Sequence, residues 1–317
     1  MRSIVLKTLA LICLVSGTGA AQAQTLDPLF AGAYSLLDLG GPSGVPANLG
    51  GLTLKAGDSN RLLIGGAANG ATGAIYDIGV TRDGGGHING FSGSGVNFAS
   101  APNIDGGLAY GPGGVLFATT YSNNNLLQYK PGSIAPDKVI DLSILGIAPS
   151  TGTIQFTSTG AVIASYNAST FYSVGLTPDG LGTFNLTVGP SVTTPGGPEG
   201  IIYVPTGSDI FAALNPAANW MLVSEYSAGR VSAYEADSNG LPIGATRRDF
   251  ITGLTGAEGA AQDPTNNDFL FSTFGGGNRV ITVRGFAAPP ATSAPEPGTL
   301  ALVALGMTLP LVRRRRK

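Results

Sequence analysis

A unit of about 50 residues recurs five times in this 317-residue chain and limits the folds open to it. Each unit contains a short apolar strand, a turn, a strongly apolar second strand, and an alternating third strand that returns after a turn of Ser, Asn or Gly. The units begin 46 to 59 residues apart, at Gly51, Gly107, Thr153, Gly200 and Gly259. Four short strands with their turns need about 40 to 50 residues. The spacing therefore predicts an all-β fold, a β-propeller of about five four-stranded blades.

The last unit lacks a fourth strand, because the chain after Phe286 is rich in Ala, Pro, Thr and Ser. The segment from Tyr34 to Leu39 (YSLLDL) precedes the first unit and resembles the fourth strand from Val139 to Leu142 (VIDL). We expect this N-terminal strand to pair with the last blade, since that pairing closes the ring and covers an exposed edge. An insertion from Ala212 to Asn219 fits no strand of the repeat, so six blades are the alternative.

The N-terminus has the pattern of a secretory signal peptide. Arg2 and Lys7 supply positive charge, the run from Ile4 to Val15 is apolar, and Ala21-Gln22-Ala23 is a small-x-small cleavage site. We therefore assign residues 1–23 to the signal peptide, residues 24–290 to the propeller domain and residues 291–317 to a separate tail.

The tail contains Pro295-Glu296-Pro297, an apolar run from Leu300 to Val312, and the basic end Arg313, Arg314, Arg315, Arg316 and Lys317. This layout resembles the PEP-CTERM sorting signal of exported bacterial proteins. The resemblance implies a transient inner-membrane anchor, cleavage by an exosortase-type sorting protease, and delivery to the cell surface or extracellular matrix of a Gram-negative bacterium. As a helix, residues 298–312 reach about 22 Å, short of the roughly 30 Å hydrocarbon core, so a transmembrane segment would need local thinning of the bilayer. The alternative is a C-terminal anchor that is never cut.

The charge of the propeller domain restricts its partners. The chain has 17 basic and 19 acidic residues, but seven of the basic residues and one acidic residue lie outside residues 24–290, which leaves a net charge of about −8. No basic stripe is present to neutralise phosphates, which argues against nucleic acid and anionic lipid as partners. Extracellular polysaccharide and surface proteins are the partners that we expect.

Side chains suited to catalysis are few. His87 is the single histidine, Cys13 is the single cysteine and lies in the signal peptide, and no Gly-x-Ser-x-Gly motif offers a nucleophilic serine. Zinc sites built from His and Cys are therefore excluded. We expect His87 at the surface or on an edge strand, and we expect no catalysis.

The start of the repeat unit resembles the NHL-repeat and gluconolactonase-like propellers. The match is closest at Pro198-Glu199-Gly200-Ile201, and Ala257-Glu258-Gly259 is the second. In gluconolactonase-like propellers a glutamate at this type of position helps to hold a divalent cation. The resemblance thus implies a metal site of Glu199 and Glu258, with Asp105, one residue earlier in its own unit, as the only further carboxylate at hand. From the residues alone we favour a different reading, in which both glutamates accept hydrogen bonds from backbone amides at the strand entry.

These observations favour an exported, surface-sorted binding or extracellular-matrix protein without catalysis. No cofactor is expected apart from a divalent cation such as calcium, if the three carboxylates hold one. The first alternative is a metal-dependent hydrolase of lactones or similar esters at the mouth of the propeller channel. The second is a lectin-like module for exopolysaccharide, for which Trp220, the only tryptophan, is the candidate ligand-binding residue.

Overall fold

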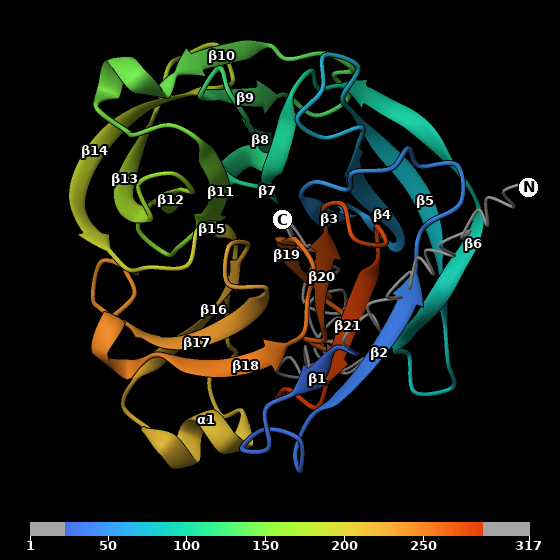
Figure 1. Ribbon diagram of the computed structural model, residues 1–317. Helices are drawn as coiled ribbons and strands as arrows, with labels where there is room; N and C mark the ends of the chain where they lie inside the picture. Colours follow the sequence, from blue (N-terminus) through green and yellow to red (C-terminus); the bar gives the residue numbers. More distant parts are fainter. Residues whose placement is uncertain (1–22, 288–317) are drawn as a thin grey trace, which may run out of the picture.

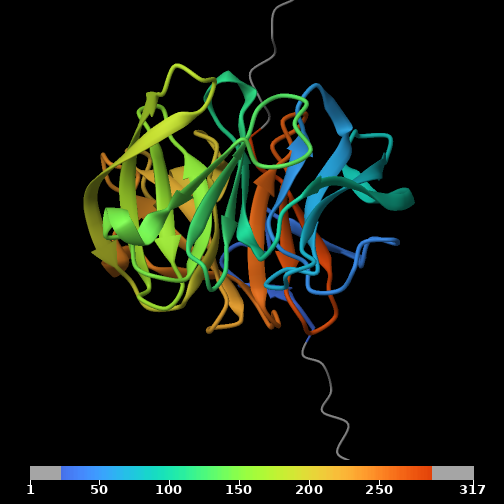
Figure 2. The ribbon, with the colours of Figure 1, turned by 90° about the horizontal axis from the view of Figure 1, so that it is seen from above.

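The computed structural model describes residues 23–287, which form five antiparallel sheets around one axis. Figure 1 looks along this axis and shows the first strand of each repeat at the centre and the fourth at the rim. Seen from above, the sheets stand side by side as packed blades (Figure 2). The prediction of a five-bladed, all-β propeller is confirmed.

Within each blade the strands pair antiparallel, and in the first three blades they follow the sequence order from the axis outward. The first blade consists of β3 (Leu52–Lys55), β4 (Asp58–Gly66), β5 (Ala74–Arg82) and β6 (Ile88–Ser100). The second consists of β7 (Ile104–Tyr110), β8 (Leu116–Thr120), β9 (Asn125–Tyr129) and β10 (Lys138–Asp141). The third consists of β11 (Thr151–Phe156), β12 (Ala161–Ser165), β13 (Thr170–Pro178) and β14 (Phe184–Thr193).

The last two blades also take strands from the N-terminal segment. The fourth consists of β15 (Pro198–Tyr203), β16 (Asn219–Glu225), β17 (Arg230–Ala236), β18 (Arg248–Thr252) and the additional β1 (Thr25–Leu26). The fifth consists of β19 (Ala257–Gln262), β20 (Phe269–Thr273), β21 (Val280–Arg284) and β2 (Ser35–Gly40). Three 3-10 helices lie in connections, at η1 (Pro112–Gly114), η2 (Leu142–Leu145) and η3 (Gly244–Thr246).

The N-terminal strand closes the ring as predicted. β2 pairs antiparallel with β21, from Ser35 opposite Arg284 to Gly40 opposite Val280. The pairing of β1 with β18, at the edge of the preceding blade, was not predicted by the repeat pattern. The segment thus covers the outer edges of two neighbouring blades, which would otherwise expose unpaired backbone groups.

An aromatic cluster holds the turn between β1 and β2. Phe30 and Tyr34 are buried against Phe211, Phe250 and Phe286, with ring centroids 4.5 to 5.9 Å apart. Phe211 belongs to α1 (Asp209–Leu214), which lies at the rim beneath the fourth blade (Figure 1). The insertion in the fourth unit is therefore the end of this helix and its return to the sheet, and the six-bladed alternative is wrong.

Glycines allow the innermost strands to approach one another closely at the axis. A Cβ atom added to Gly51 would lie 2.6 Å from the Gly106 carbonyl oxygen, and one added to Gly106 would lie 2.2 Å from that of Glu199. A Cβ atom on Gly200 would lie 2.4 Å from the carbonyl oxygen of Glu258. Because no side chain fits at such distances, glycine is required here by packing. We call this group the glycine hub: Gly51, Gly106, Gly200 and Gly259.

The predicted transport segments lie largely outside the structure. Residues 1–22 of the signal peptide and the whole tail, residues 291–317, fall outside the described residues. Within residues 23–287, no helix is long and apolar enough to cross a membrane.

Candidate functional site

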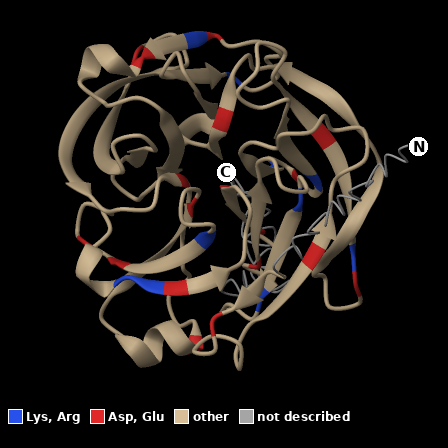
Figure 3. Cartoon of the chain, in the orientation of Figure 1, with Lys and Arg blue, Asp and Glu red and all other residues tan. Residues whose placement is uncertain are grey.

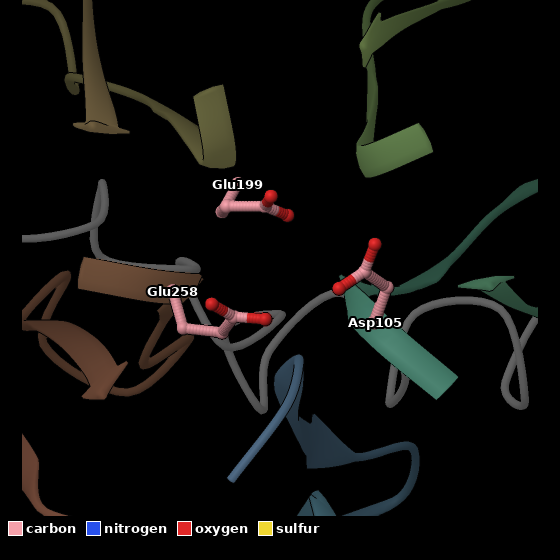
Figure 4. A group of neighbouring side chains, drawn as sticks. All are labelled: Asp105, Glu199 and Glu258. Carbon is pink, nitrogen blue, oxygen red and sulfur yellow. The ribbon is translucent and has the colours of Figure 1, made fainter. Parts of the chain in front are cut away.

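Three acidic side chains from three blades meet on the axis. Asp105 of β7, Glu199 of β15 and Glu258 of β19 each offer a carboxylate oxygen, and these oxygens lie within 4.8 Å of one another. Figure 4 shows the three side chains pointing toward one another. All are buried, with 1%, 5% and 1% of their surface exposed. The structure therefore brings together the three residues that the sequence suggested as ligands of a cation.

Backbone irregularities place the three carboxylates at the same height. Each is the second residue of its inner strand, where a β-bulge interrupts pairing with the next strand. In β7 the register shifts between Ile104 and Leu108, whereas in β15 it shifts between Pro198 and Gly200, so the β7 bulge is the longer one. The longer bulge absorbs the extra residue that separates Asp105 from its glycine. Bulges redirect side chains in this way beside functional sites.

The first and third blades contribute space at this position. Gly152 of β11 is the third-blade counterpart of Glu199, and a Cβ atom added to it would lie 2.3 Å from Glu199 Oε2. Gly50, the first-blade counterpart, would bring a Cβ atom within 2.7 Å of the Asp105 carbonyl oxygen. Glycine at these two positions therefore leaves room for the Glu199 side chain and for the Asp105 backbone.

The carboxylates have few hydrogen-bond donors. Asp105 forms hydrogen bonds with Ser150 Oγ, at 3.4 Å from its Oδ2, and with the Gly106 amide, Asn69 and Glu258. In contrast, Glu199 Oε2 and Glu258 Oε1 are buried without a partner. Among residues 23–287 no backbone amide donates to either glutamate side chain, and no Lys, Arg or His forms an ion pair with the three acids. Hydrogen bonding of the glutamates to backbone amides, the reading that the sequence favoured, is therefore absent from this part of the chain. Buried carboxylates are costly unless they are protonated or paired with a cation.

The protonation of the cluster follows from its burial. Burial raises the pKa of Asp105 to about 7, and burial together with the charge of Asp105 raises the pKa of Glu199 and Glu258 well above the usual range. The folded state then holds protons that the unfolded chain releases. Without a metal, stability therefore falls as pH rises from the usual carboxyl range through these raised values. A divalent cation acts in the opposite direction, because it replaces the protons and binds more tightly as pH rises.

A pocket of about 260 Å³ opens above the carboxylates. Glu199 and Glu258 line it together with Asn69, whose Oδ1 is buried without a partner. Four aromatic rings complete the lining, and we call them the aromatic collar: Tyr121, Tyr166, Tyr226 and Phe274. No Lys or Arg lines this pocket. Figure 3 shows that acidic and basic positions both occur on several blades.

The collar residues occupy one position of the repeat, directly after the second strand of four blades. Each amide donates to the carbonyl of the residue before the inner strand, for example from Tyr121 to Asn103 at 2.9 Å and from Tyr226 to Gly197 at 2.9 Å. Because the hairpin returns the chain to its starting end, collar and carboxylates share one mouth of the propeller. The sequence analysis missed the collar. Its signal is the aromatic residue that ends TTY, ASY, SEY and STF in four units.

Other residues singled out in the sequence lie away from this site. Trp220 is 4% exposed and packs against Phe211, with ring centroids 5.4 Å apart, which leaves little of its ring free to stack on a sugar. The suggested carbohydrate contact at Trp220 therefore does not fit its burial. His87 is half-buried just before β6, an outer strand, with Nδ1 2.6 Å from Asp268 Oδ2 at the seam between the first and fifth blades. The sorting-motif residues, Pro295 to Pro297 and Arg313 to Arg316, lie outside the described residues.

Comparison with known proteins gives similarities of fold at low identity. No family model matches the chain, and no curated protein matches it. Glutaminyl cyclase of Myxococcus xanthus is similar in structure, with 12% identity and a TM-score of 0.47 over 81% of this chain and 97% of that one. The PQQ-bound aldose sugar dehydrogenase of Streptomyces coelicolor has 14% identity and a TM-score of 0.43, over 78% of this chain and 83% of that one. Similarities this distant carry no argument about activity, and the fold rests on the strand pairing described above.

Proposed function

We propose that this protein is an exported β-propeller that binds its ligand at the axial pocket, without catalysis, and that Asp105, Glu199 and Glu258 hold a divalent cation there. The observation that carries the proposal is the convergence of three buried carboxylates, to which no cationic side chain of residues 23–287 is paired. Burial of three ionised carboxylates is unfavourable unless a positive charge balances them, and a bound divalent cation supplies that charge.

The donor set favours calcium. Calcium takes oxygen ligands at 2.3 to 2.6 Å, so two oxygens on opposite sides of one ion are about 5 Å apart. Oxygens within 4.8 Å of one another fit that arrangement. Asn69 Oδ1 supplies a further unpaired oxygen at the pocket, and the open pocket leaves room for water or ligand oxygens. Magnesium is a poorer fit because it demands near-octahedral geometry at about 2.1 Å.

Direct measurement of bound metal tests this proposal. After chelation and dialysis into dilute calcium, we expect about one calcium ion per chain by elemental analysis, and a saturable heat of binding by calorimetry. Asp105→Asn should weaken the calcium affinity at least about tenfold, because a buried ligand loses its charge. Asp58→Asn, at an exposed position, is the matched control and should leave affinity unchanged. A parent protein that binds no divalent cation would contradict the proposal.

A second candidate is the metal-dependent hydrolase of lactones or esters. It is favoured by one observation: Glu199 and Glu258 both line the open pocket, so that a substrate oxygen could reach a cation held there. Against it, no histidine lies among the pocket-lining residues to serve as a general base, and the third carboxylate is not part of the pocket lining. Turnover of a lactone panel that requires calcium and is lost in Asp105→Asn would move this candidate to first place.

Export and sorting form the remaining part of the proposal. Its support is the order of signal peptide, propeller, Pro-Glu-Pro motif, apolar run and basic end in the sequence. We propose an exosortase-type protease as the sorting partner and the cell surface or extracellular matrix as the destination. We propose extracellular polysaccharide as the binding partner of this acidic, non-catalytic domain at the cell surface or in the matrix.

Fractionation of cells tests the role of the tail. In a host without the sorting protease, deletion of residues 295–317 should move the protein from the membrane pellet to the soluble fraction, because the apolar run is removed and the propeller is untouched. Glu296→Ala is the matched control: it keeps the apolar run and alters only the sorting motif, so in a host that has the sorting protease the variant should stay in the membrane uncut while the parent is released. If the truncated protein still sediments with membranes, another surface is the anchor.

A further inference from the structure

We propose that the aromatic collar binds one neutral sugar unit, seated directly above the cation site of Asp105, Glu199 and Glu258. The inference rests on the proposed function and names the class of ligand for that site. It is carried by three features of the pocket: repeated rings, the absence of positive charge, and size.

The collar rings are built into the fold at a repeated position, yet they are not fully buried in the core. Tyr121 is 40% exposed, and the other three rings are half-buried at the pocket wall. Tyr166 and Tyr226 meet edge to face at 5.6 Å and 89°, and Tyr226 and Phe274 meet at 6.2 Å and 63°. Rings at an open mouth offer apolar faces and polar hydroxyls together, which suits a ligand that has both kinds of surface.

The rings are also held in place before any ligand arrives. Tyr166 Oη and Ser227 Oγ lie 3.1 Å apart and share a hydrogen bond. Gly197 has a φ of 71°, and a Cβ atom there would lie 2.7 Å from the Tyr166 ring, so glycine makes room for that ring. A preformed wall loses little conformational entropy on binding.

Charge selects among possible ligands. Among residues 23–287 no Lys or Arg lines the pocket, and the three carboxylates outweigh the two charges of one calcium ion. The loaded site therefore stays net negative and disfavours phosphate, sulfate and uronate groups. An organic ammonium would suit aromatic rings and acids, but it would compete with the metal for the same carboxylates. A neutral ligand with several hydroxyl groups avoids both conflicts, because its hydroxyls can complete the coordination of a hard cation.

Size limits the ligand to a single unit. The pocket volume of about 260 Å³ lies below the roughly 300 to 1,000 Å³ of pockets for drug-sized molecules. One hexose ring fits such a space, with its C–H faces on the collar rings and its hydroxyls toward the cation and Asn69. Thus the collar provides apolar contact, and the floor provides polar recognition.

Calorimetry and saturation-transfer NMR on the calcium-loaded protein test the inference. The probes are the methyl glycosides of glucose, galactose, mannose and xylose, with methyl glucuronide and choline as charged counterparts. We expect at least one neutral glycoside to bind, and Tyr121→Ala to weaken its affinity about tenfold through the loss of one stacked ring. Tyr121→Phe should retain the affinity within about twofold, since it keeps the ring. Ile134→Ala, an exposed apolar residue outside the collar, is the control and should change nothing.

The outcomes separate this inference from the proposed function. Calcium binding without binding of any neutral glycoside overturns the sugar inference and leaves the cation site intact. Choline that binds and displaces calcium overturns it too, as does a preference for glucuronide. Sugar affinity that is unchanged in Tyr121→Ala removes that ring from recognition and likewise contradicts the inference. If calcium does not bind to the parent protein, both the proposed cation site and the sugar site that rests on it are contradicted.

Discussion

Deletion of residues 24–40 should prevent the propeller from folding into a stable ring. The deletion removes β1 and β2, so that the fourth and fifth blades each lose their outer strand. It also removes Phe30 and Tyr34 from the aromatic cluster, and loss of a buried phenylalanine side chain alone costs about 3 to 5 kcal/mol. Whole domains are stable by only about 5 to 15 kcal/mol. We therefore expect the truncated protein to be unfolded at 37 °C and to show no cooperative unfolding transition on heating. Circular dichroism during thermal unfolding measures this directly.

Matched variants separate closure of the ring from general damage. Phe30→Ala should cost about 3 to 5 kcal/mol, whereas Leu29→Ala, at the adjacent and 42% exposed residue, should cost less than about 0.5 kcal/mol. A synthetic peptide of residues 24–40 should restore part of the stability of the truncated protein, because it supplies the missing strands. An unchanged melting temperature in the truncated chain would contradict the role of these strands in closure.

Replacement of both axial glutamates should abolish the stabilisation of the protein by calcium and weaken the dependence of its stability on pH. In the metal-free parent, stability should fall between about pH 5 and 8, because the folded state holds carboxyl protons with raised pKa values. Calcium at 100 times its Kd should add about 2.7 kcal/mol, which raises the melting temperature by roughly 5 to 10 °C in a domain of this size. Glu199→Gln with Glu258→Gln should abolish the calcium effect and reduce the pH dependence, since Asp105 is then the one carboxyl group of the cluster that still titrates.

The same variants distinguish cation binding from simple structural roles. Without calcium at pH 8, the double variant should be at least as stable as the parent, because two buried acidic groups have become neutral amides. Glu235→Gln, a half-buried glutamate of β17 outside the cluster, is the control and should keep the calcium response. Thermal unfolding of parent, single and double variants with and without calcium provides the comparison. Equal behaviour of parent and double variant in calcium would exclude a shared ion.

The architecture could be predicted because each blade repeats a local pattern. The five inner strands, the hairpins and the closing strand are all encoded in short local patterns, and the structure confirms that they form. Their starts were less exact, because four of the five inner strands begin two or three residues before the predicted start of the unit. The addition of β1 to β18 could not be predicted, since two residues, Thr25 and Leu26, carry no periodic signal. The helix α1 was not predicted for a similar reason: its six residues are too few to show helical periodicity.

The site was predictable only in part. Glu199 and Glu258 share a repeat position, so the sequence itself places them side by side on inner strands. Asp105 appears out of register in the sequence, and only the longer bulge of β7 brings it to the same height. The collar residues lie one position beyond the strands, where an aromatic residue looks like part of a turn until the three-dimensional position of all four is known.

The glycine hub has a consequence for any polymer that meets this protein. Because the innermost backbones approach one another so closely just beyond the carboxylates, the pocket has a floor and the axis offers no passage from one face to the other. A chain molecule therefore cannot be threaded through the ring; it can enter only by a free end or a side branch. The number of protein molecules bound to one polysaccharide would then depend on how many termini and branch points the polysaccharide has. It would not increase with the length of an unbranched chain.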